Sequence, residues 1–357
     1  MSEDRTLRIK ETERQPLIDL LRFIAAMMVA TFHWRLEVGN ERFQGISDLL
    51  IIGDLIKNGG FGVDIFFVIS GFVIISAAQK YNAIEFIFAR FNRLFPGLLI
   101  SMLIVLTVGS YFIHTFENPF TSFFHSIFLT YQIAGVQPLA TPLWTLIIEI
   151  KFYIGVAIAL LLLPRLFKST RGIVILLTSW ILVISILGKI APPSLATYLL
   201  PFLTLNGYSN LFALGICFNL LSKVKIGITQ ENLLVSIISL YFIVDIFFVA
   251  NTPGILKLYL TIASVLIVFG GKFTFHPLLQ KVTYWLGLSS YLIYLLHVHL
   301  GMAFVLQLQA RITSNIFFVI GGAAALITIS SILLAILVEK PTQRYFRVQF
   351  QKFYKRH

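Results

Sequence analysis

The chain has 357 residues, of which 57% are apolar and only 12% are charged, and its mean hydropathy is +0.87. This composition excludes a soluble enzyme and indicates a polytopic membrane protein. The formal net charge is +12, but the basic residues lie in short clusters between apolar runs, which argues for membrane topology and against a nucleic-acid partner. The single cysteine, Cys217, excludes an internal disulfide and a cysteine-rich metal site.

Ten apolar runs are long enough to predict membrane-spanning helices, which makes the expected fold all-α. We place them at 17–35, 61–79, 94–113, 143–163, 172–190, 198–221, 232–250, 255–271, 285–307 and 314–338. The first run follows a polar, arginine-rich segment. It is too long for a cleaved signal peptide and no small-residue cleavage site comes after it, so we interpret it as a retained signal anchor. No repeat or linker divides the sequence. We therefore expect a single domain over 1–357, with short basic tails at 1–16 and 342–357.

The distribution of lysine and arginine predicts the orientation. With a cytoplasmic N-terminus, twenty of the 28 basic residues fall in inner segments, six in outer loops and two within spans. Because positive charge accumulates on the cytoplasmic side, both termini are expected to be cytoplasmic. Two outer loops, Arg35–Gly60 and His114–Thr141, are long enough to cover an extracytoplasmic site, or are simple connections between spans.

Arg22 and His33 lie eleven residues apart in the first apolar run. At about 100° per residue, their side chains fall within ~20° of each other around a helix and ~16 Å apart along its axis. Both are costly in hydrocarbon, so a shared face predicts a path across the bilayer. We expect His33 to act as a general base on a hydroxyl or as an acyl-accepting nucleophile. The alternative is a histidine that only hydrogen-bonds at the interface.

The second apolar run opens with glycines that permit close helix approach, followed by Asp64 in the outer leaflet. Asp64 either joins one polar cluster with His33 and Glu149 or is a favourable charge at a helix start.

Arg90 and Arg93 lie three residues apart just before the third apolar run, on one face of a helix. Guanidinium groups suit phosphate recognition, so with Arg22 they predict a site for a phosphorylated cytoplasmic donor. The alternative is that the pair only anchors the topology.

Glu149 lies about two turns below the outer end of the fourth run, at a depth comparable with that of His33. We expect this carboxylate to orient the histidine, or else to pair with a cation for packing. Lys151 is a poor partner because it projects about 200° away. In the ninth run His297 is expected to hydrogen-bond in the same polar channel or to be structural. His299, at i+2, points away from it, so no metal site is predicted.

These residues follow the order of the motifs in membrane-bound acyltransferase family 3, which the chain resembles over almost its full length. The segments are Arg22 to His33, Phe61-Gly62-Val63-Asp64 through Ser70-Gly71-Phe72, Arg90 with Arg93 and Pro96, Pro142-Leu143-Trp144 through Glu149 and Phe152-Tyr153, and Ser290-Tyr291 through His297. Val338-Glu339-Lys340-Pro341 matches the family's closing segment. The chain departs from many relatives at Ile150, Lys151 and His299.

The resemblance implies an O-acetyltransferase in the bacterial inner (plasma) membrane. The implied donor is cytoplasmic acetyl-CoA, held by Arg22, Arg90 and Arg93. The implied acceptor is a hydroxyl of an extracytoplasmic glycan or lipid-linked sugar, such as an O-antigen, lipopolysaccharide or exopolysaccharide. The expected catalytic residues are His33, Glu149, Asp64 and His297, with no metal.

Two alternatives remain at this point. One is a proton-coupled transporter or flippase of lipid-linked glycan, in which the buried polar residues form a proton relay. The sequence shows no inverted repeat and no paired helix-breaking segments, which argues against it. The other is a membrane scaffold within a glycan-assembly complex, which would not explain polar residues buried on several separate spans. The resemblance itself implies a stand-alone transferase and leaves open a glycan-assembly partner that performs a second step.

Overall fold

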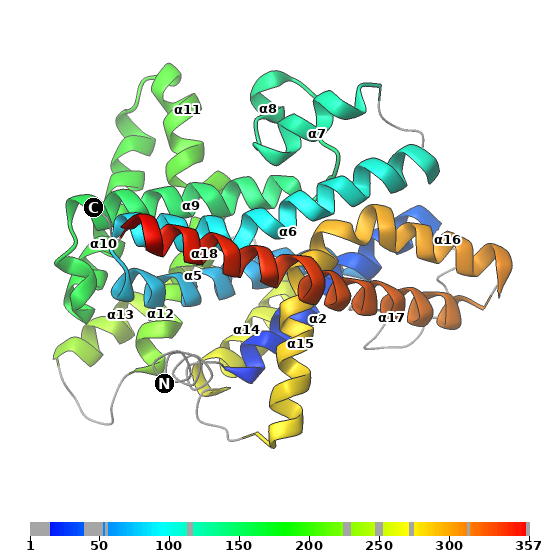
Figure 1. The fold of residues 1–357 in the computed structure, drawn as a ribbon. Coiled ribbons are helices and arrows are strands. Elements are labelled where there is room, and N and C mark those ends of the chain that lie inside the picture. The colour runs from blue at the N-terminus through cyan, green and yellow to red at the C-terminus, as the bar shows by residue number, and fades with distance from the viewer. Residues whose placement is uncertain are drawn as a thin grey trace.

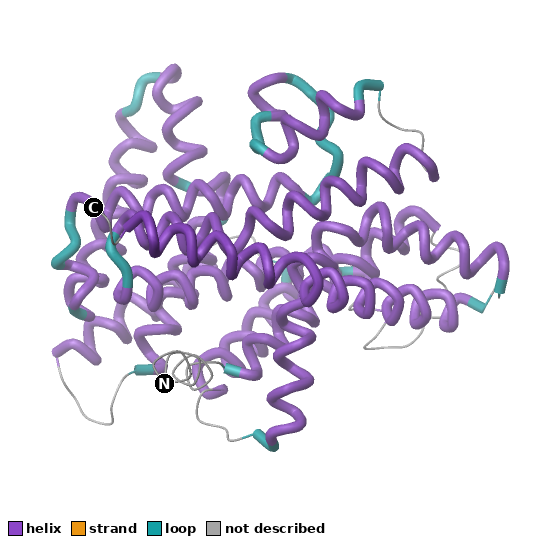
Figure 2. The backbone as a smooth tube through the Cα atoms, in the orientation of Figure 1, coloured by secondary structure: helices purple, strands orange, loops and turns teal. Residues whose placement is uncertain are grey.

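The protein is built from helices that pack against one another within a membrane-type bundle. The computed structural model describes residues 15–38, 53, 56–112, 117–223, 230–246, 253–270, 275–312 and 315–354. Within these ranges every regular element is helical and none is a strand (Figure 2). Seven helices of the described part of the chain are long and apolar enough to cross a membrane, and three shorter apolar helices accompany them there. The prediction of an all-α polytopic membrane protein is confirmed, whereas the count of ten spans stays a prediction.

The elements follow the predicted order closely (Figure 1). The first half of the chain forms α2 (Pro16–Val38), η1 (Gly59–Phe61), α5 (Gly62–Lys80), α6 (Ala83–Phe112), α7 (Pro119–Ile127), α8 (Tyr131–Ala134) and α9 (Leu143–Leu162). The second half forms η2 (Leu166–Lys168), α10 (Thr170–Ile190), α11 (Pro193–Leu203), η3 (Leu205–Gly207), α12 (Ser209–Ser222), α13 (Gln230–Val244), α14 (Gly254–Gly270), α15 (Pro277–Leu296), η5 (His297–Gly301), α16 (Met302–Arg311), α17 (Ile316–Leu334), η6 (Ala335–Glu339) and α18 (Lys340–Tyr354). Parts of both predicted outer loops, at 39–52, 54–55 and 114–116, and of the tails, at 1–14 and 355–357, lie outside the described residues.

The third span starts earlier than the apolar run predicts, at Ala83 instead of residue 94. A reciprocal cap at its start explains this: the Asn82 N–H donates to Glu85 Oε2 (3.1 Å) and the Glu85 N–H donates to Asn82 Oδ1 (3.0 Å). Such a box satisfies two of the otherwise unpaired amide groups at a helix N-terminus. The cap sets the start of α6, and Arg90 and Arg93 therefore lie inside a continuous helix.

The segment predicted as the C-terminal tail is also helical. The π-turn η6 joins α17 directly to α18, which runs alongside the first part of α6 (Figure 1). Aromatic rings hold the two helices together, since Phe88 stacks on Phe350 with ring centroids 3.8 Å apart. Asn82 Nδ2 also donates to the Tyr354 hydroxyl over 3.0 Å. The predicted basic tail is therefore helical over 342–354 and packs against α6.

The predicted span 198–221 is interrupted. Helix α11 ends at Leu203 and α12 begins at Ser209, and between them Leu205, Asn206 and Gly207 have positive φ angles of 50°, 56° and 94°. Three such residues in succession stop a right-handed helix. The side chain of Asn206 accepts a hydrogen bond from Lys151 Nζ (2.8 Å), so the break gives the lysine of α9 a polar partner.

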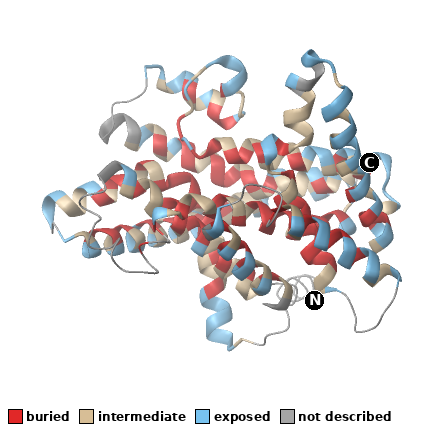
Figure 3. Cartoon of the chain, turned by 180° about the vertical axis from the view of Figure 1, so that it is seen from behind, coloured by how far each residue is buried: buried red, intermediate tan, exposed pale blue. Residues whose placement is uncertain are grey.

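The buried centre of the bundle, which Figure 3 shows in red, lies where α5 crosses its neighbours. Helix α5 packs against α2, α9 and α12. Gly71 of α5 and Gly215 of α12 make the closest approach, because a Cβ at Gly71 would overlap the Phe212 carbonyl and one at Gly215 would overlap the Val68 carbonyl. Small residues at such crossings let helix backbones approach within a membrane.

This contact predicts the effect of single methyl groups. Gly71→Ala or Gly215→Ala forces the two helices apart and is expected to lower the free energy of unfolding by about 1–3 kcal/mol. Gly321→Ala in α17 is the matched control, because nothing lies within 4 Å of its added Cβ. Thermal unfolding in detergent measures all three variants. Equal melting temperatures for the variants and the wild type would contradict the close contact.

Candidate active site

A cationic cavity opens at the end of the bundle where the charge distribution predicts the cytoplasm. Its volume is about 710 Å³, and residues of α2, α5, α6, α12, α15 and α18 line it. We call it the inner vestibule. The cations along its wall are Arg22, Lys80, Arg90, Arg93, Lys223 and Lys340. Among the described lining residues Asp19 is the only carboxylate. The vestibule therefore carries a large excess of positive charge, which favours an anionic ligand.

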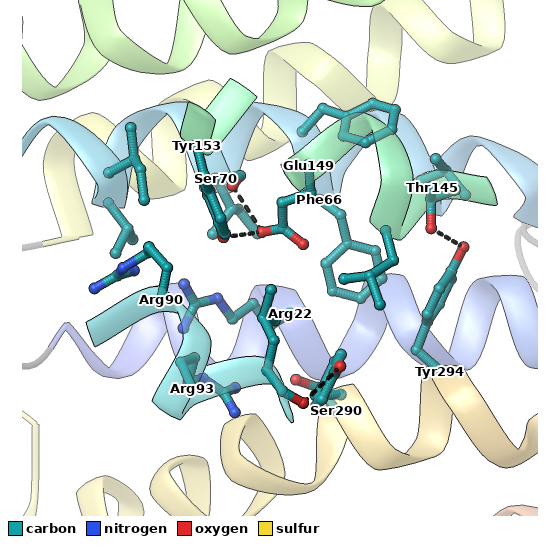
Figure 4. Close-up of a pocket in the computed structure, with 18 of the residues that line it drawn as sticks. Arg22, Phe66, Ser70, Arg90, Arg93, Thr145, Glu149, Tyr153, Ser290 and Tyr294 are labelled. Carbon is teal, nitrogen blue, oxygen red and sulfur yellow. Dashed lines mark hydrogen bonds between the residues drawn. The ribbon is translucent and has the colours of Figure 1, made fainter. Parts of the chain in front are cut away.

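A second, narrower cavity of about 120 Å³ continues from the vestibule into the bundle. The two share Arg22, Arg90 and Arg93, so we call the second one the arginine cavity. Figure 4 shows the three guanidinium groups gathered at one end, with Glu149 facing them and Thr145 with Tyr294 at the other end. The structure thus brings together the three arginines that the sequence predicts as one site, from α2 and α6.

Two of the three arginines already have acidic partners. Arg93 donates to Glu339 Oε1 over 2.9 Å, and the side chain of Glu339 is fully buried. Arg22 Nη1 lies 3.9 Å from Asp19 Oδ1, which is a looser pairing within the first turns of α2.

Arg90 differs from both. Its guanidinium lies over the rings of Phe86 and Tyr153, at 5.8 and 6.0 Å from their centroids. Its buried Nε has no hydrogen-bond partner among the described residues. Of the three arginines, Arg90 therefore keeps the most donor capacity for a ligand.

Glu149 belongs to the arginine cavity and not to the histidine. Its Oε1 accepts a hydrogen bond from Ser70 Oγ (2.9 Å) and a short one from the Tyr153 hydroxyl, and it interacts electrostatically with Arg22. No hydrogen bond joins it to His33 in the described part of the chain. The expected contact of Glu149 with His33 is therefore wrong. Equal depth along two helices does not fix the direction in which their side chains point.

The alternative for Glu149 was pairing with a cation, and the cation that it interacts with is Arg22. Lys151, expected to be a poor partner, bonds Asn206 instead. Tyr153, whose hydroxyl does bond Glu149, is one turn further along α9 and on the same face. Neither Tyr153 nor Ser70 was singled out as a site residue, although the i, i+4 spacing of Glu149 and Tyr153 carried that signal.

A tyrosine closes the far end of the arginine cavity. The hydroxyl of Tyr294 lies 2.7 Å from Thr145 Oγ1, so a hydrogen bond joins α15 to the start of α9 (Figure 4). On its other side the Tyr294 ring lies next to the ring of His297, with centroids 5.8 Å apart. Tyr294 therefore stands between the arginine cavity and the histidines.

His33 and His297 form a pair. His33 Nδ1 is 2.9 Å from the Val29 carbonyl oxygen, and His297 Nδ1 is 2.7 Å from that of Tyr294. A carbonyl only accepts, so we assign the proton of each ring to Nδ1. His297 Nε2 then accepts from His33 Nδ1 across 3.3 Å. This leaves the lone pair of His33 Nε2 available to take a proton.

The position of His297 is fixed by a distortion of its helix. The π-turn η5 begins at His297, and its carbonyl accepts a hydrogen bond from the fully buried Trp34 Nε1 over 2.8 Å. π-Turns release carbonyl groups from the normal helical pattern and often occur at functional sites. Gly301 makes room for the indole, since a Cβ there would lie 2.8 Å from Trp34 Cζ2. Trp34, next to His33 in sequence, thus ties α2 to the histidine of η5.

Asp64 belongs neither to the lining of the arginine cavity nor to the pair of His33 and His297. It is in the first turn of α5, and among the described residues its carboxylate forms no hydrogen bond with His33 or Glu149. Of the two interpretations that the sequence left open, the geometry favours a charge at a helix start. The described residues also contain no group of three histidine, cysteine or acidic side chains able to hold a metal ion.

Comparison with known families identifies the class of protein. A family model described as an acyltransferase domain, that of membrane acyltransferase family 3, matches residues 16–335. The chain therefore belongs to acyltransferase family 3. The matched range runs from the start of α2 into η6 and includes the vestibule arginines, Glu149 and both histidines. Comparisons with curated proteins and with solved structures found no match to the chain.

The ion pair of Arg93 with Glu339 predicts that removing one side chain lowers the unfolding free energy more than removing the other. Arg93→Ala leaves a fully buried carboxylate without its cation and is expected to cost about 3 kcal/mol of unfolding free energy. Glu339→Ala costs less, because Arg93 is partly exposed, at 34% of its side chain. Adding Glu339→Leu to Arg93→Ala should restore most of the loss.

The exposed pair of Arg171 with Glu231, at 3.3 Å, is the control, and its double-mutant cycle should give less than about 1 kcal/mol. Unfolding in mixed micelles provides the free energies. An Arg93–Glu339 cycle as small as that of the control would show that the buried pair is unimportant for stability.

Proposed function

We propose that this acyltransferase moves an acetyl group from cytoplasmic acetyl-CoA to a hydroxyl of an extracytoplasmic glycan, in a bacterial inner membrane. The observation that carries the proposal is the sequence of polar groups along one line. Cations of the inner vestibule come first, then the arginine cavity, then Tyr294, and finally the pair of His33 and His297. A donor with a charged head and a long neutral arm fits this order.

The inner end supports a donor that carries several phosphates. Guanidinium groups bind phosphate oxygens through two parallel hydrogen bonds, and the arginines line the passage between the two cavities. Glu149, held by Ser70 and Tyr153, offsets part of their charge and keeps the arginine cavity from being uniformly positive. We assign Glu149 to charge balance and to positioning of the arginines, in place of the direct role at His33 that the sequence suggested.

The outer end supports base catalysis by His33. In the proposed step, Nε2 takes the proton of the sugar hydroxyl while its oxygen attacks the thioester carbonyl. The carbon–sulfur bond breaks, and the departing CoA thiolate receives the proton back from His33. The Nδ1 proton stays between the Val29 carbonyl and His297 Nε2. These two acceptors stabilise the imidazolium while it exists and hold the ring in position, so His297 is a positioning residue.

A second route uses the same nitrogen. His33 Nε2 attacks the thioester, CoA leaves, and the acyl group passes from the histidine to the sugar. A burst of CoA release in the absence of acceptor distinguishes this route from direct transfer. In either route the thioester must pass Tyr294, and this requires its hydrogen bond with Thr145 to open.

A transporter or flippase is the competing proposal. The interrupted helix of α11 and α12 is a feature that many transporters share. Radiolabelled acetyl-CoA separates the two functions, because a carrier leaves the label on CoA and a transferase moves it to the glycan. Comparing the ester content of surface polysaccharide by NMR, with and without the protein, then identifies the acceptor.

The proposed role of His33 predicts a specific loss. His33→Ala removes the base and should reduce acetyl transfer by at least about 100-fold, with acetyl-CoA affinity unchanged. His125→Ala is the control, since that histidine bonds Thr130 beside α7. Transfer is measured as label incorporated into polysaccharide, and affinity by calorimetry. Wild-type transfer by His33→Ala would remove the histidine from the mechanism.

The proposed role of Arg90 predicts a loss of donor binding, in contrast to the loss of transfer predicted for His33→Ala. Arg90→Ala should weaken acetyl-CoA binding by about tenfold or more, because a charged hydrogen bond is lost. Arg171→Ala removes an arginine that bonds Gln230 and Glu231 and serves as the control. Undiminished affinity in Arg90→Ala would reduce the arginine pair of α6 to a topology signal.

A further inference from the structure

The rim of the inner vestibule carries a second set of cations that the arginine site does not explain. Lys80 ends α5, Lys223 follows α12 and Lys340 begins α18, so three separate helices bring lysines to one cavity. None of them lines the arginine cavity, so they lie further from the reacting end than the arginines do. The three lysines come from distant parts of the sequence and line the same cavity, so they offer positive charge to an anion at its mouth.

Two of these lysines contact neutral groups at the rim, and Lys340 also interacts electrostatically with Glu339, the carboxylate that pairs with Arg93. Lys223 Nζ donates to Gln79 Oε1 over 2.9 Å. Lys340 Nζ lies over the rings of Tyr284 and Trp285, 4.4 Å from each centroid. Aromatic faces hold an ammonium group in place without neutralising its charge. The contacts with Gln79 and with the two rings therefore position the ammonium groups at the rim without adding a negative charge there.

The order of groups along the cavities matches the order of groups in CoA. From the thioester outward, CoA consists of the pantetheine arm, a pyrophosphate, and a ribose that carries a separate 3′-phosphate. From the histidines outward, the protein presents the arginine cavity, the three arginines and the lysine rim. When the two orders are aligned from the thioester outward, the pyrophosphate lies at the arginines and the 3′-phosphate lies at the lysines.

The choice of side chain agrees with this alignment. Planar guanidinium groups suit the bridging geometry of a pyrophosphate, whereas a lysine is a compact point charge with rotatable donors. A terminal phosphate monoester carries nearly two negative charges and three exposed oxygens, which several ammonium groups from different directions satisfy.

We infer that Lys223 and Lys340, with Lys80, bind the 3′-phosphate of the donor, so that the protein distinguishes CoA from 3′-dephospho-CoA. The inference rests on the proposed function, because it assumes a CoA donor. It adds a specificity subsite at the mouth of the vestibule, remote from the reacting atoms.

The test measures the affinity of full-length protein in phosphatidylcholine nanodiscs for CoA and for 3′-dephospho-CoA. The wild type is expected to bind CoA about tenfold or more tightly than 3′-dephospho-CoA. Lys223→Ala and Lys340→Ala should lower the affinity for CoA and leave that for 3′-dephospho-CoA unchanged, so that the ratio falls toward one. Lys168→Ala, on η2 and outside the vestibule lining, should leave both affinities as they are.

Lys340→Arg keeps the charge above the two aromatic rings and should retain most of the preference, which separates loss of charge from misfolding. Equal affinity of the wild type for both ligands would overturn the lysine subsite while leaving the CoA donor intact. Equal losses for both ligands in the lysine variants would also overturn it. Binding of neither ligand by the wild type would instead refute the proposed donor, and the inference with it.

Discussion

Positive charge buried between apolar helices is the constraint on which the rest of the structure depends. Removing a guanidinium from water costs several kcal/mol unless a partner compensates it. The bundle supplies Asp19 for Arg22 and Glu339 for Arg93, and it places Glu149 among the arginines with its own hydrogen bonds satisfied. The compensation is incomplete, because the buried Nε of Arg90 has no hydrogen-bond partner among the described residues, and the vestibule lining holds six cations against a single described carboxylate, Asp19. That surplus is what makes the inner end a site for a polyanion.

Irregular helix geometry positions the polar groups at both ends of this path. The π-turn η5 begins at His297 and gives its carbonyl to Trp34, which fixes the ring beside His33. The π-turn η6 ends at Glu339, which it brings to Arg93. If these segments were regular α-helices, the side chains and carbonyl groups of the same residues would point in different directions. The two distortions therefore connect backbone geometry to the placement of the base and of the buried ion pair.

The apolar runs and the spacing of Arg22, Arg90 and Arg93 were enough to predict the long helices and the arginine cluster, since length and helical phase are local properties. Contacts between helices that are distant in sequence are not local properties, so the sequence pattern did not predict them. Glu149 was matched to His33 by depth alone, whereas its direction follows from the packing of α9 against α5. The break at Asn206 was missed because hydropathy averaged over it, although Asn206-Gly207 is a turn signal. The start of α6 was missed because polar residues such as Asn82 and Glu85, which cap it, lower its hydropathy.

The central claim is that one polypeptide connects a donor on one side of the membrane to an acceptor on the other. The most direct measurement uses proteoliposomes of uniform orientation, with radiolabelled acetyl-CoA on the vestibule side and de-esterified polysaccharide on the opposite side. The account predicts that the label crosses to the polysaccharide, and that it does not when acetyl-CoA is supplied only on the polysaccharide side. Transfer that requires donor and acceptor in the same compartment, or label that remains on CoA, would contradict it.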